Sequence, residues 1–180
     1  VSVPLSMTDF YKSTSNNISS SIKVFEFSKK YSAPVVYASS CAVYGDLKLG
    51  NDEINNYPVL SPYAQDKLII ESYAKMSNKI FKVSSIGLRF FNVYGPGQKA
   101  NSLYSSVIPI FINRMIKKLP ITINGGHQTR DFIYVTDLVK AFFKAAISKK
   151  HGNIFNLGND KPQSINTLAK LIGGKTIYIP

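Results

Sequence analysis

The pattern of hydrophobic and polar positions divides the chain into short apolar runs and longer amphipathic stretches. The runs at 34–40 and 83–91 are short, apolar and rich in residues that favour strands, so they predict buried β-strands. Shorter strands are expected at 121–123, 131–133, 153–157 and 175–179. Apolar residues at helical spacing predict helices at 15–31, 62–77, 103–117 and 135–148, and a further helix after Ser164 as N-cap. This alternation predicts an α/β fold with a mostly parallel sheet.

Polar and glycine-rich segments follow the first two strands, where such a sheet binds its ligands. Ser39, Ser40 and Cys41 come at the end of the first strand, and residues 92–97 follow the second. No strand in the sequence is followed by a Gly-x-Gly-x-x-Gly or Gly-x-x-Gly-x-x-Gly phosphate loop. The strand ends are therefore the candidate site, without a loop for dinucleotide phosphates.

Composition narrows the classes of function. Lys and Arg outnumber Asp and Glu by 22 to 10, which gives a net charge of +12 and favours an anionic partner. The lysines are scattered, so we interpret them as solvated surface charge and expect no nucleic-acid partner. The sequence contains no membrane-length apolar run and no secretion-signal pattern, so we expect a cytoplasmic protein without membrane contact. The single Cys41 excludes an internal disulfide, and no Cys/His spacing is typical of a metal site.

Two Tyr-x-x-x-Lys pairs occur in the sequence, and their contexts differ. Tyr44 and Lys48 are separated by Gly45 and Asp46 without helical periodicity, which is typical of a turn. Tyr63 and Lys67 instead lie in a predicted helix that begins with a Ser-Pro N-terminal signal. Residues four apart on a helix share a face, so these two side chains are expected to be neighbours.

A lysine ammonium beside a tyrosine favours the phenolate, which would lower the pKa of Tyr63 below its reference value of about 10. A tyrosine with such a pKa can remove a proton from an alcohol. Ser40, at a strand end, is placed to orient the alcohol oxygen. The Ser40, Tyr63 and Lys67 set therefore predicts proton transfer to and from a hydroxyl group.

Three longer segments, 37–46, 61–67 and 88–98, resemble in order and spacing the motifs of the extended short-chain dehydrogenase/reductases, in particular the NAD-dependent epimerase/dehydratases. Residues 107–109, 121–125, 129–137 and 155–158 are similar to the substrate-domain signatures of that family. The first residues are similar to the segment after the family's His-x-Ala-Ala strand end, and Asn17 falls on its helix asparagine. The resemblance covers nearly the whole chain.

The resemblance implies a role for each matching residue. Tyr63 would be the general base, Lys67 its partner and a ligand of the cofactor ribose, and Ser40 the residue that orients the substrate hydroxyl. The NAD cofactor would also contact Ser39 and Phe91. The substrate would be a nucleotide-diphosphate sugar, held by Ser40, Asn92, Gln98, Val107, Asn124 and Arg130.

The resemblance also implies a domain plan. Residues 1–91 would form the second part of a Rossmann-like parallel sheet with the catalytic residues, and 92–180 mainly a small α/β substrate-binding subdomain with returning segments. A homodimer is expected. The sequence starts after the family's glycine-rich loop and ends before its usual second phosphate-binding arginine, so we expect a fragment whose activity alone is in question.

The implied reaction is inversion at C4 of a UDP-hexose or UDP-N-acetylhexosamine through a transient 4-keto sugar. A 4,6-dehydratase or a decarboxylase of the same family, and a non-catalytic sugar-nucleotide-binding remnant, are the alternatives. Dehydratases of the family place an acidic pair after the serine-equivalent hydroxyl residue. Here Cys41 and Ala42 occupy those positions, which favours an epimerase.

Overall fold

The computed structural model describes residues 2–47, 58–101 and 105–179. The chain forms two compact units. Unit 1 contains Val1–Phe90 and Val139–Leu157, and unit 2 contains Phe91–Leu138 and Gly158–Pro180. The chain therefore leaves unit 1 after the second strand, builds most of unit 2, and returns once to unit 1 before it finishes in unit 2.

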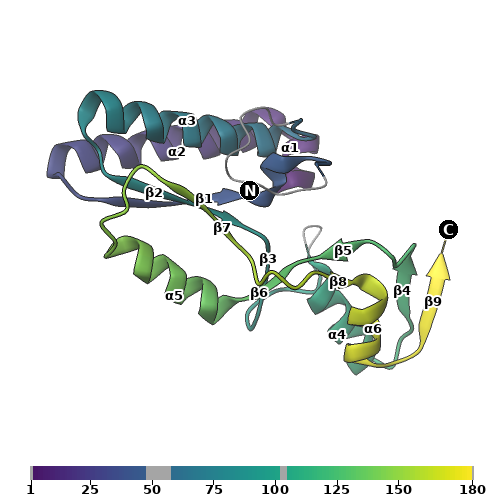
Figure 1. Ribbon diagram of the computed structural model, residues 1–180. Coiled ribbons are helices and arrows are strands. Elements are labelled where there is room, and N and C mark those ends of the chain that lie inside the picture. The colour runs from purple at the N-terminus through teal and green to yellow at the C-terminus, as the bar shows by residue number, and fades with distance from the viewer. Residues whose placement is uncertain (1, 48–57, 102–104, 180) are drawn as a thin grey trace. The chain divides into compact units, whose positions relative to one another are not determined.

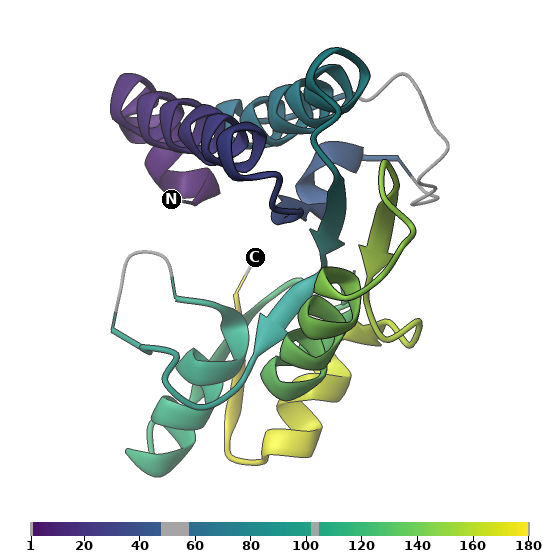
Figure 2. The ribbon, with the colours of Figure 1, turned by 90° about the vertical axis from the view of Figure 1, so that its left-hand side faces the viewer.

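Unit 1 is a parallel sheet with helices packed against it. Its elements are α1 (Val3–Thr8), α2 (Phe10–Tyr31), β1 (Val35–Ser40), the 3-10 helix η1 (Cys41–Tyr44), α3 (Pro62–Phe81), β2 (Ser85–Phe90) and β7 (Ile154–Leu157). The strand order is β1-β2-β7, and both pairs are parallel. Helices α2 and α3 run side by side along one face of the sheet (Figures 1 and 2), while α5 (Val135–Ala146) brings the chain back into the unit.

The core of unit 1 explains why the apolar runs become strands. Phe25 from α2, Val35 from β1 and Ile70 from α3 meet in one buried cluster under the two helices. Residues Ser85 to Arg89 of β2 are all buried, because β2 is the central strand and is covered on both faces. Burial therefore fixes the register at which β1 and β2 end, and so where the residues after them lie.

Unit 2 is built from shorter elements around a second core. It contains β3 (Asn92–Tyr94), α4 (Val107–Ile116), β4 (Ile121–Asn124), β5 (Thr129–Arg130), β6 (Phe132–Tyr134), β8 (Gln163–Ser164), α6 (Ile165–Ile172) and β9 (Thr176–Ile179). Strand pairs β3–β6 and β4–β9 are parallel, and β5–β8 is antiparallel. Phe111 of α4, Ile121 and Ile123 of β4, and Leu168 of α6 form its buried core.

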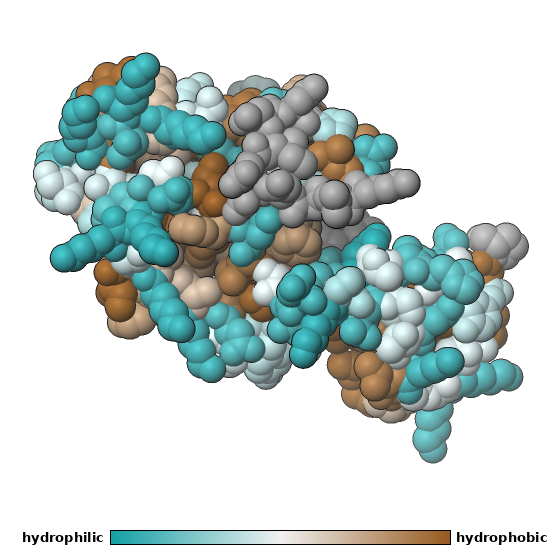
Figure 3. All heavy atoms as spheres, in the orientation of Figure 1, coloured by the Kyte–Doolittle hydropathy of each residue, from teal (hydrophilic) through white to brown (hydrophobic). Residues whose placement is uncertain are grey.

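This architecture confirms the predicted α/β fold with a parallel sheet. The structure adds α1, η1 and the two- and three-residue strands β3, β5 and β8, which have too few residues to show a period in sequence. The expected helix at 103–117 is observed from Val107, and residues 103 and 104 lie outside the described ranges. No helix within the described parts of the chain is long and apolar enough to cross a membrane. On the face seen in Figure 3, hydrophilic and apolar side chains are interspersed.

Candidate active site

The carboxyl end of β1 presents the hydroxyl of Ser40 at a fixed turn. Ser40 is the last residue of β1 and the N-cap of η1, and the Ala42 N–H donates to its Oγ at 3.1 Å. Capping makes Ser40 both the end of the strand and the start of the next turn, so its side chain has little freedom. The end of β1 therefore holds the Ser40 hydroxyl in one orientation.

Helix α3 delivers the other two predicted catalytic residues. The Ser61 side chain caps the helix by accepting from the Ala64 N–H at 3.2 Å, and Pro62 occupies the first helical position. Tyr63 follows at the second, where its N–H donates to Ser6 Oγ of α1 at 3.1 Å. The local sequence therefore sets the start of α3, and one helical turn sets the step from Tyr63 to Lys67.

The structure brings Ser40, Tyr63 and Lys67 together within unit 1. The Ser40 hydroxyl lies within hydrogen-bonding reach of the Tyr63 phenol. The Lys67 ammonium lies 5.5 Å from the centroid of the Tyr63 ring and donates to the Ala38 carbonyl of β1 at 2.9 Å. The three side chains therefore form one cluster across β1, η1 and α3.

The pKa of Tyr63 differs from the sequence-based expectation. Burial raises the pKa of Tyr63 above its ordinary value, the hydrogen bond from Ser40 partly opposes that effect, and Cys41 adds to it. Burial also lowers the pKa of Lys67, with Asp66 partly opposing. The expectation that the pKa of Tyr63 lies below its ordinary value is therefore wrong, because the phenolate loses water on burial.

Two buried residues beside this cluster, Glu71 and Arg89, were not identified from the sequence. Ser39, predicted as a cofactor contact, is buried, and its hydroxyl donates to Glu71 Oε1 at 2.5 Å. A cofactor contact by Ser39 would therefore fall to its main chain. Glu71 is in turn paired with Arg89 of β2. Tyr44 is buried in η1, and Lys48, its partner in the second Tyr-x-x-x-Lys pair, lies outside the described residues.

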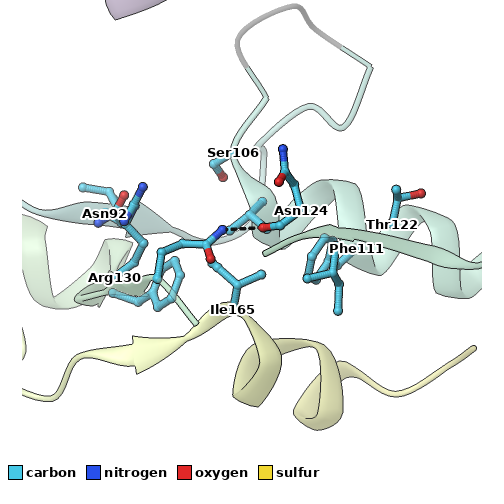
Figure 4. Close-up of a pocket in the computed structure, with 12 residues that line it drawn as sticks. Asn92, Ser106, Phe111, Thr122, Asn124, Arg130 and Ile165 are labelled. Carbon is cyan, nitrogen blue, oxygen red and sulfur yellow. Dashed lines mark hydrogen bonds between the residues drawn. The ribbon is translucent and has the colours of Figure 1, made fainter. Parts of the chain in front are cut away.

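Unit 2 contains a cavity of about 350 Å³ that gathers four of the predicted substrate-binding residues. These are Asn92, Val107, Asn124 and Arg130, which come from β3, α4, β4 and β5. Asn92, Asn124 and Arg130 are labelled in Figure 4. The cavity is also lined by Val93, Ser106, Phe111, Thr122, Ile123, Gln128, Phe132 and Ile165. Strand pairing and helix packing therefore assemble a site from residues spread over more than seventy positions.

Hydrogen bonds fix the polar wall of this cavity. Asn92 Nδ2 donates to the Asp131 carbonyl at 3.1 Å, and Gln128 Nε2 donates to the Asn124 carbonyl at 2.8 Å, the dashed line in Figure 4. Arg130 Nη1 donates to the Thr129 carbonyl at 2.7 Å, and the guanidinium carries further N–H donors. A cationic fork beside amide groups and an apolar floor suits a ligand with a phosphate and a flat ring.

Two residues differ from the sequence-based prediction of the substrate site. Ser106 was not predicted but lines this cavity, and Gln98 was predicted but does not line it. Ser106 Oγ lines the cavity, is buried, and has no hydrogen-bond partner among the described residues. Nothing in its sequence context distinguishes Ser106 from its neighbours. Gln98 lines a separate cavity of unit 2 beside Tyr94, and its Nε2 donates to the Val93 carbonyl at 2.9 Å. The predicted cofactor contact Phe91 follows β2 and is half-buried.

We find no candidate metal-binding site among the described residues. No group of three or more His, Cys, Asp and Glu side chains there could hold a metal ion.

The NAD-dependent epimerase/dehydratase family matches residues 2–158, which is most of the chain. A Methanocaldococcus jannaschii protein provisionally named a UDP-glucose 4-epimerase is 40% identical over 162 residues, covering 87% of this chain and 52% of that protein. The Escherichia coli dTDP-4-dehydro-6-deoxyglucose reductase is 39% identical over 142 residues, covering 77% of this chain and 43% of the reductase. These relatives carry different reaction names, so similarity alone does not select the reaction.

A solved structure extends the likeness over the fold. The UDP-N-acetylglucosamine 4-epimerase of Methanobrevibacter ruminantium M1, in complex with UDP-N-acetylmuramic acid, superposes with a TM-score of 0.93 at 34% identity. The match covers 99% of this chain and 60% of that one. Among the curated relatives that it matches, the chain spans about half of their length.

Proposed function

Because this chain belongs to the NAD-dependent epimerase/dehydratase family, we propose that the protein inverts C4 of a nucleotide-diphosphate sugar, a UDP-hexose or a UDP-N-acetylhexosamine. The observation that carries the proposal is the grouping of Ser40 at the end of β1 with Tyr63 and Lys67, which lie one helical turn apart on α3. This cluster can hold a substrate hydroxyl and exchange its proton.

The residues of unit 1 fit the family's cofactor. Lys67 donates to Ala38, and because an ammonium has three N–H donors it can also hold ribose hydroxyls. Tyr63 and Ser40 lie at the carboxyl end of a parallel strand, where dinucleotides bind in such sheets. Bound NAD supplies the acceptor and later the donor of a hydride. No described strand is followed by a glycine-rich phosphate loop, so no described residue is assigned to the dinucleotide phosphates.

In the proposed reaction, the chain's own residues position the sugar and move one proton. Ser40 orients the 4-hydroxyl, and Tyr63, once it has lost its own proton, takes the hydroxyl proton as the C4 hydride departs, leaving a 4-keto sugar. After the sugar has turned its other face, the C4 hydride returns, and Tyr63 gives the proton back to the 4-oxygen. The lining of the unit 2 cavity would hold the nucleotide diphosphate throughout.

The residues after Ser40 favour epimerisation over 4,6-dehydration. Elimination of water across C5 and C6 needs one group to remove the C5 proton and another to protonate the departing hydroxyl. Cys41 and Ala42 occupy those positions in η1. Alanine exchanges no proton, and a thiol with a reference pKa of about 8.5 is a poor substitute for a carboxylic acid. The reaction left to the 4-keto intermediate is then return of the hydride to C4.

Product analysis tests the reaction. Incubation of the intact protein and NAD with UDP-glucose, UDP-N-acetylglucosamine and dTDP-glucose, followed by proton NMR, is expected to show inverted C4 couplings on at least one UDP-sugar. A 6-deoxy-4-keto product from dTDP-glucose would overturn the proposal in favour of a dehydratase. Binding of nucleotide sugars without any product would favour a non-catalytic remnant.

A substitution in the unit 2 cavity tests the substrate class. We expect Arg130→Ala to weaken UDP-sugar binding by about 10- to 100-fold, because hydrogen bonds to a charged partner are worth roughly 1.5–3 kcal/mol. Arg130 is exposed, so the melting temperature should change little. Lys170→Ala, which removes an exposed cation from α6 outside the cavity, is the matched control. Calorimetric titration with UDP measures both, and equal affinities would contradict the phosphate-binding role.

The homodimer and the cytoplasmic location stay predictions.

A further inference from the structure

A buried ion pair lies beside the catalytic cluster and takes no direct part in the proposed chemistry. Arg89 of β2 donates from Nε to Glu71 Oε1 at 2.8 Å and from Nη2 to Glu71 Oε2 at 2.7 Å. The two side chains are 2% and 5% exposed. Two parallel hydrogen bonds of this kind fix the relative orientation of both groups. The ion pair therefore fixes the position of helix α3 relative to strand β2.

The same pair also binds the residues on either side of Ser40. Ser39 donates to Glu71 Oε1, and Arg89 Nη1 donates to the hydroxyl of Tyr44 at 2.9 Å. That hydroxyl in turn donates to Asn156 Oδ1 of β7 at 2.5 Å. Ser39 precedes Ser40, and Tyr44 closes the 3-10 turn that Ser40 caps. Both ends of the short segment that carries Ser40 are therefore tied to one ion pair.

Stability is a poor explanation for such a network. Removing two charges from water costs several kcal/mol per ion, and well-packed apolar residues of similar volume are often as stabilising or more so. What an apolar pair cannot supply is directional contact with two hydroxyl groups. The network therefore fits a requirement for position.

We propose that the network of Arg89, Glu71, Ser39, Tyr44 and Asn156 is a positioning device that holds the Ser40 hydroxyl in hydrogen-bonding register with Tyr63. Glu71 lies eight residues after Tyr63 on α3 and four after Lys67. The Glu71 carboxylate therefore connects the end of β1 to the helix that carries Tyr63 and Lys67. The catalytic consequence rests on the proposed function, whereas the effect on the bond between Ser40 and Tyr63 does not.

Tyr44→Phe is the mildest perturbation, because it removes one hydroxyl and leaves the ion pair and the ring in place. We expect kcat to fall by about 10- to 100-fold with KM for the nucleotide sugar nearly unchanged, since misplacement of a reacting group acts on the chemical step. Tyr73→Phe, on α3 and packed against the core of unit 1, is the control and should leave both constants unchanged. Equal loss in both variants would overturn the proposal.

A double-mutant cycle separates positioning from general structural damage. If Tyr44 acts through Ser40, then Tyr44→Phe should cause no further loss of kcat when Ser40→Ala is already present. Full additivity of the two losses would overturn the proposal. A second variant, Glu71→Leu with Arg89→Met, should fold because both charges are removed together, yet lose kcat to a similar extent. Normal kcat in that variant would also overturn it.

A readout without turnover distinguishes this proposal from the reaction itself. The Ser40 hydrogen bond lowers the pKa of Tyr63, so Tyr44→Phe should raise that pKa toward its value in Ser40→Ala. Carbon-13 NMR of labelled tyrosine, with the Tyr63 signal assigned by Tyr63→Phe, measures it. A raised pKa without any epimerisation would support the positioning device and refute the proposed function. Epimerisation with an unchanged pKa in Tyr44→Phe would do the reverse.

Discussion

Tyr63→Phe is expected to lower kcat by about 10²- to 10⁴-fold, the range in which positioned proton transfer contributes to catalysis. The change removes one oxygen, which lies within hydrogen-bonding reach of Ser40, and keeps the ring at the second position of α3. The free energy of unfolding should fall by only about 0.5–1.5 kcal/mol, the net worth of one hydrogen bond. Nucleotide-sugar binding should persist, because the candidate diphosphate cavity is formed by residues of unit 2.

Steady-state kinetics, calorimetric titration with UDP-sugar and thermal melting measure these three quantities on the same protein. Tyr73→Phe on the same helix controls for the loss of any tyrosine hydroxyl from α3 and should behave as the unsubstituted protein. Turnover near the unsubstituted level in Tyr63→Phe would remove the assignment of Tyr63 as general base. Loss of turnover together with loss of folding would assign Tyr63 a packing role instead.

Glu71→Ala is expected to give the largest loss of stability, about 3–5 kcal/mol, because it leaves a buried cation without its counter-charge. Arg89 is 2% exposed and cannot reach water to recover its hydration. Ser39 would lose its acceptor in the same substitution. Urea unfolding followed by circular dichroism measures the effect, with Glu26→Ala, an exposed glutamate of α2, as the control.

The paired replacement Glu71→Leu with Arg89→Met gives the opposite expectation for stability. With both charges gone, no buried ion is left alone, so the free energy of unfolding should return close to that of the unsubstituted protein. A double variant as unstable as Glu71→Ala would mean that the hydrogen bonds to Ser39 and Tyr44, more than the charge, hold the sheet and helix together. A stable Glu71→Ala protein would show that the ion pair is dispensable.

The sequence by itself determined the parts of the site that depend on local geometry. Ser61 and Pro62 define the start of α3, and the helical repeat then places Tyr63 and Lys67 on one face. Strand β1 ends at Ser40, the last residue of the run 34–40, because the Ser40 side chain caps the 3-10 turn that follows. These outcomes follow from backbone capping, side-chain periodicity and burial, which act over a few residues and are visible in a single chain.

Tertiary structure alone decided which distant groups share a contact. Arg89 falls within an apolar run, and nothing in that run announces that its guanidinium pairs with Glu71 on a helix formed eighteen residues earlier. The same holds for Asp131, whose carbonyl receives Asn92 only because β3 pairs with β6. Side chains separated this far in sequence meet through the packing of whole elements, which no local pattern encodes.

The direction in which the pKa of Tyr63 shifts shows the same division between what the sequence determines and what the tertiary structure determines. Sequence placed a cation one turn away, and proximity of opposite charge by itself lowers a phenol's pKa. The folded protein instead buries the phenol, and the loss of hydration raises the pKa of Tyr63, while the Lys67 ammonium donates to the Ala38 carbonyl. Helix spacing is a property of the chain, whereas hydration depends on every element that covers the group, and only the folded structure determines it.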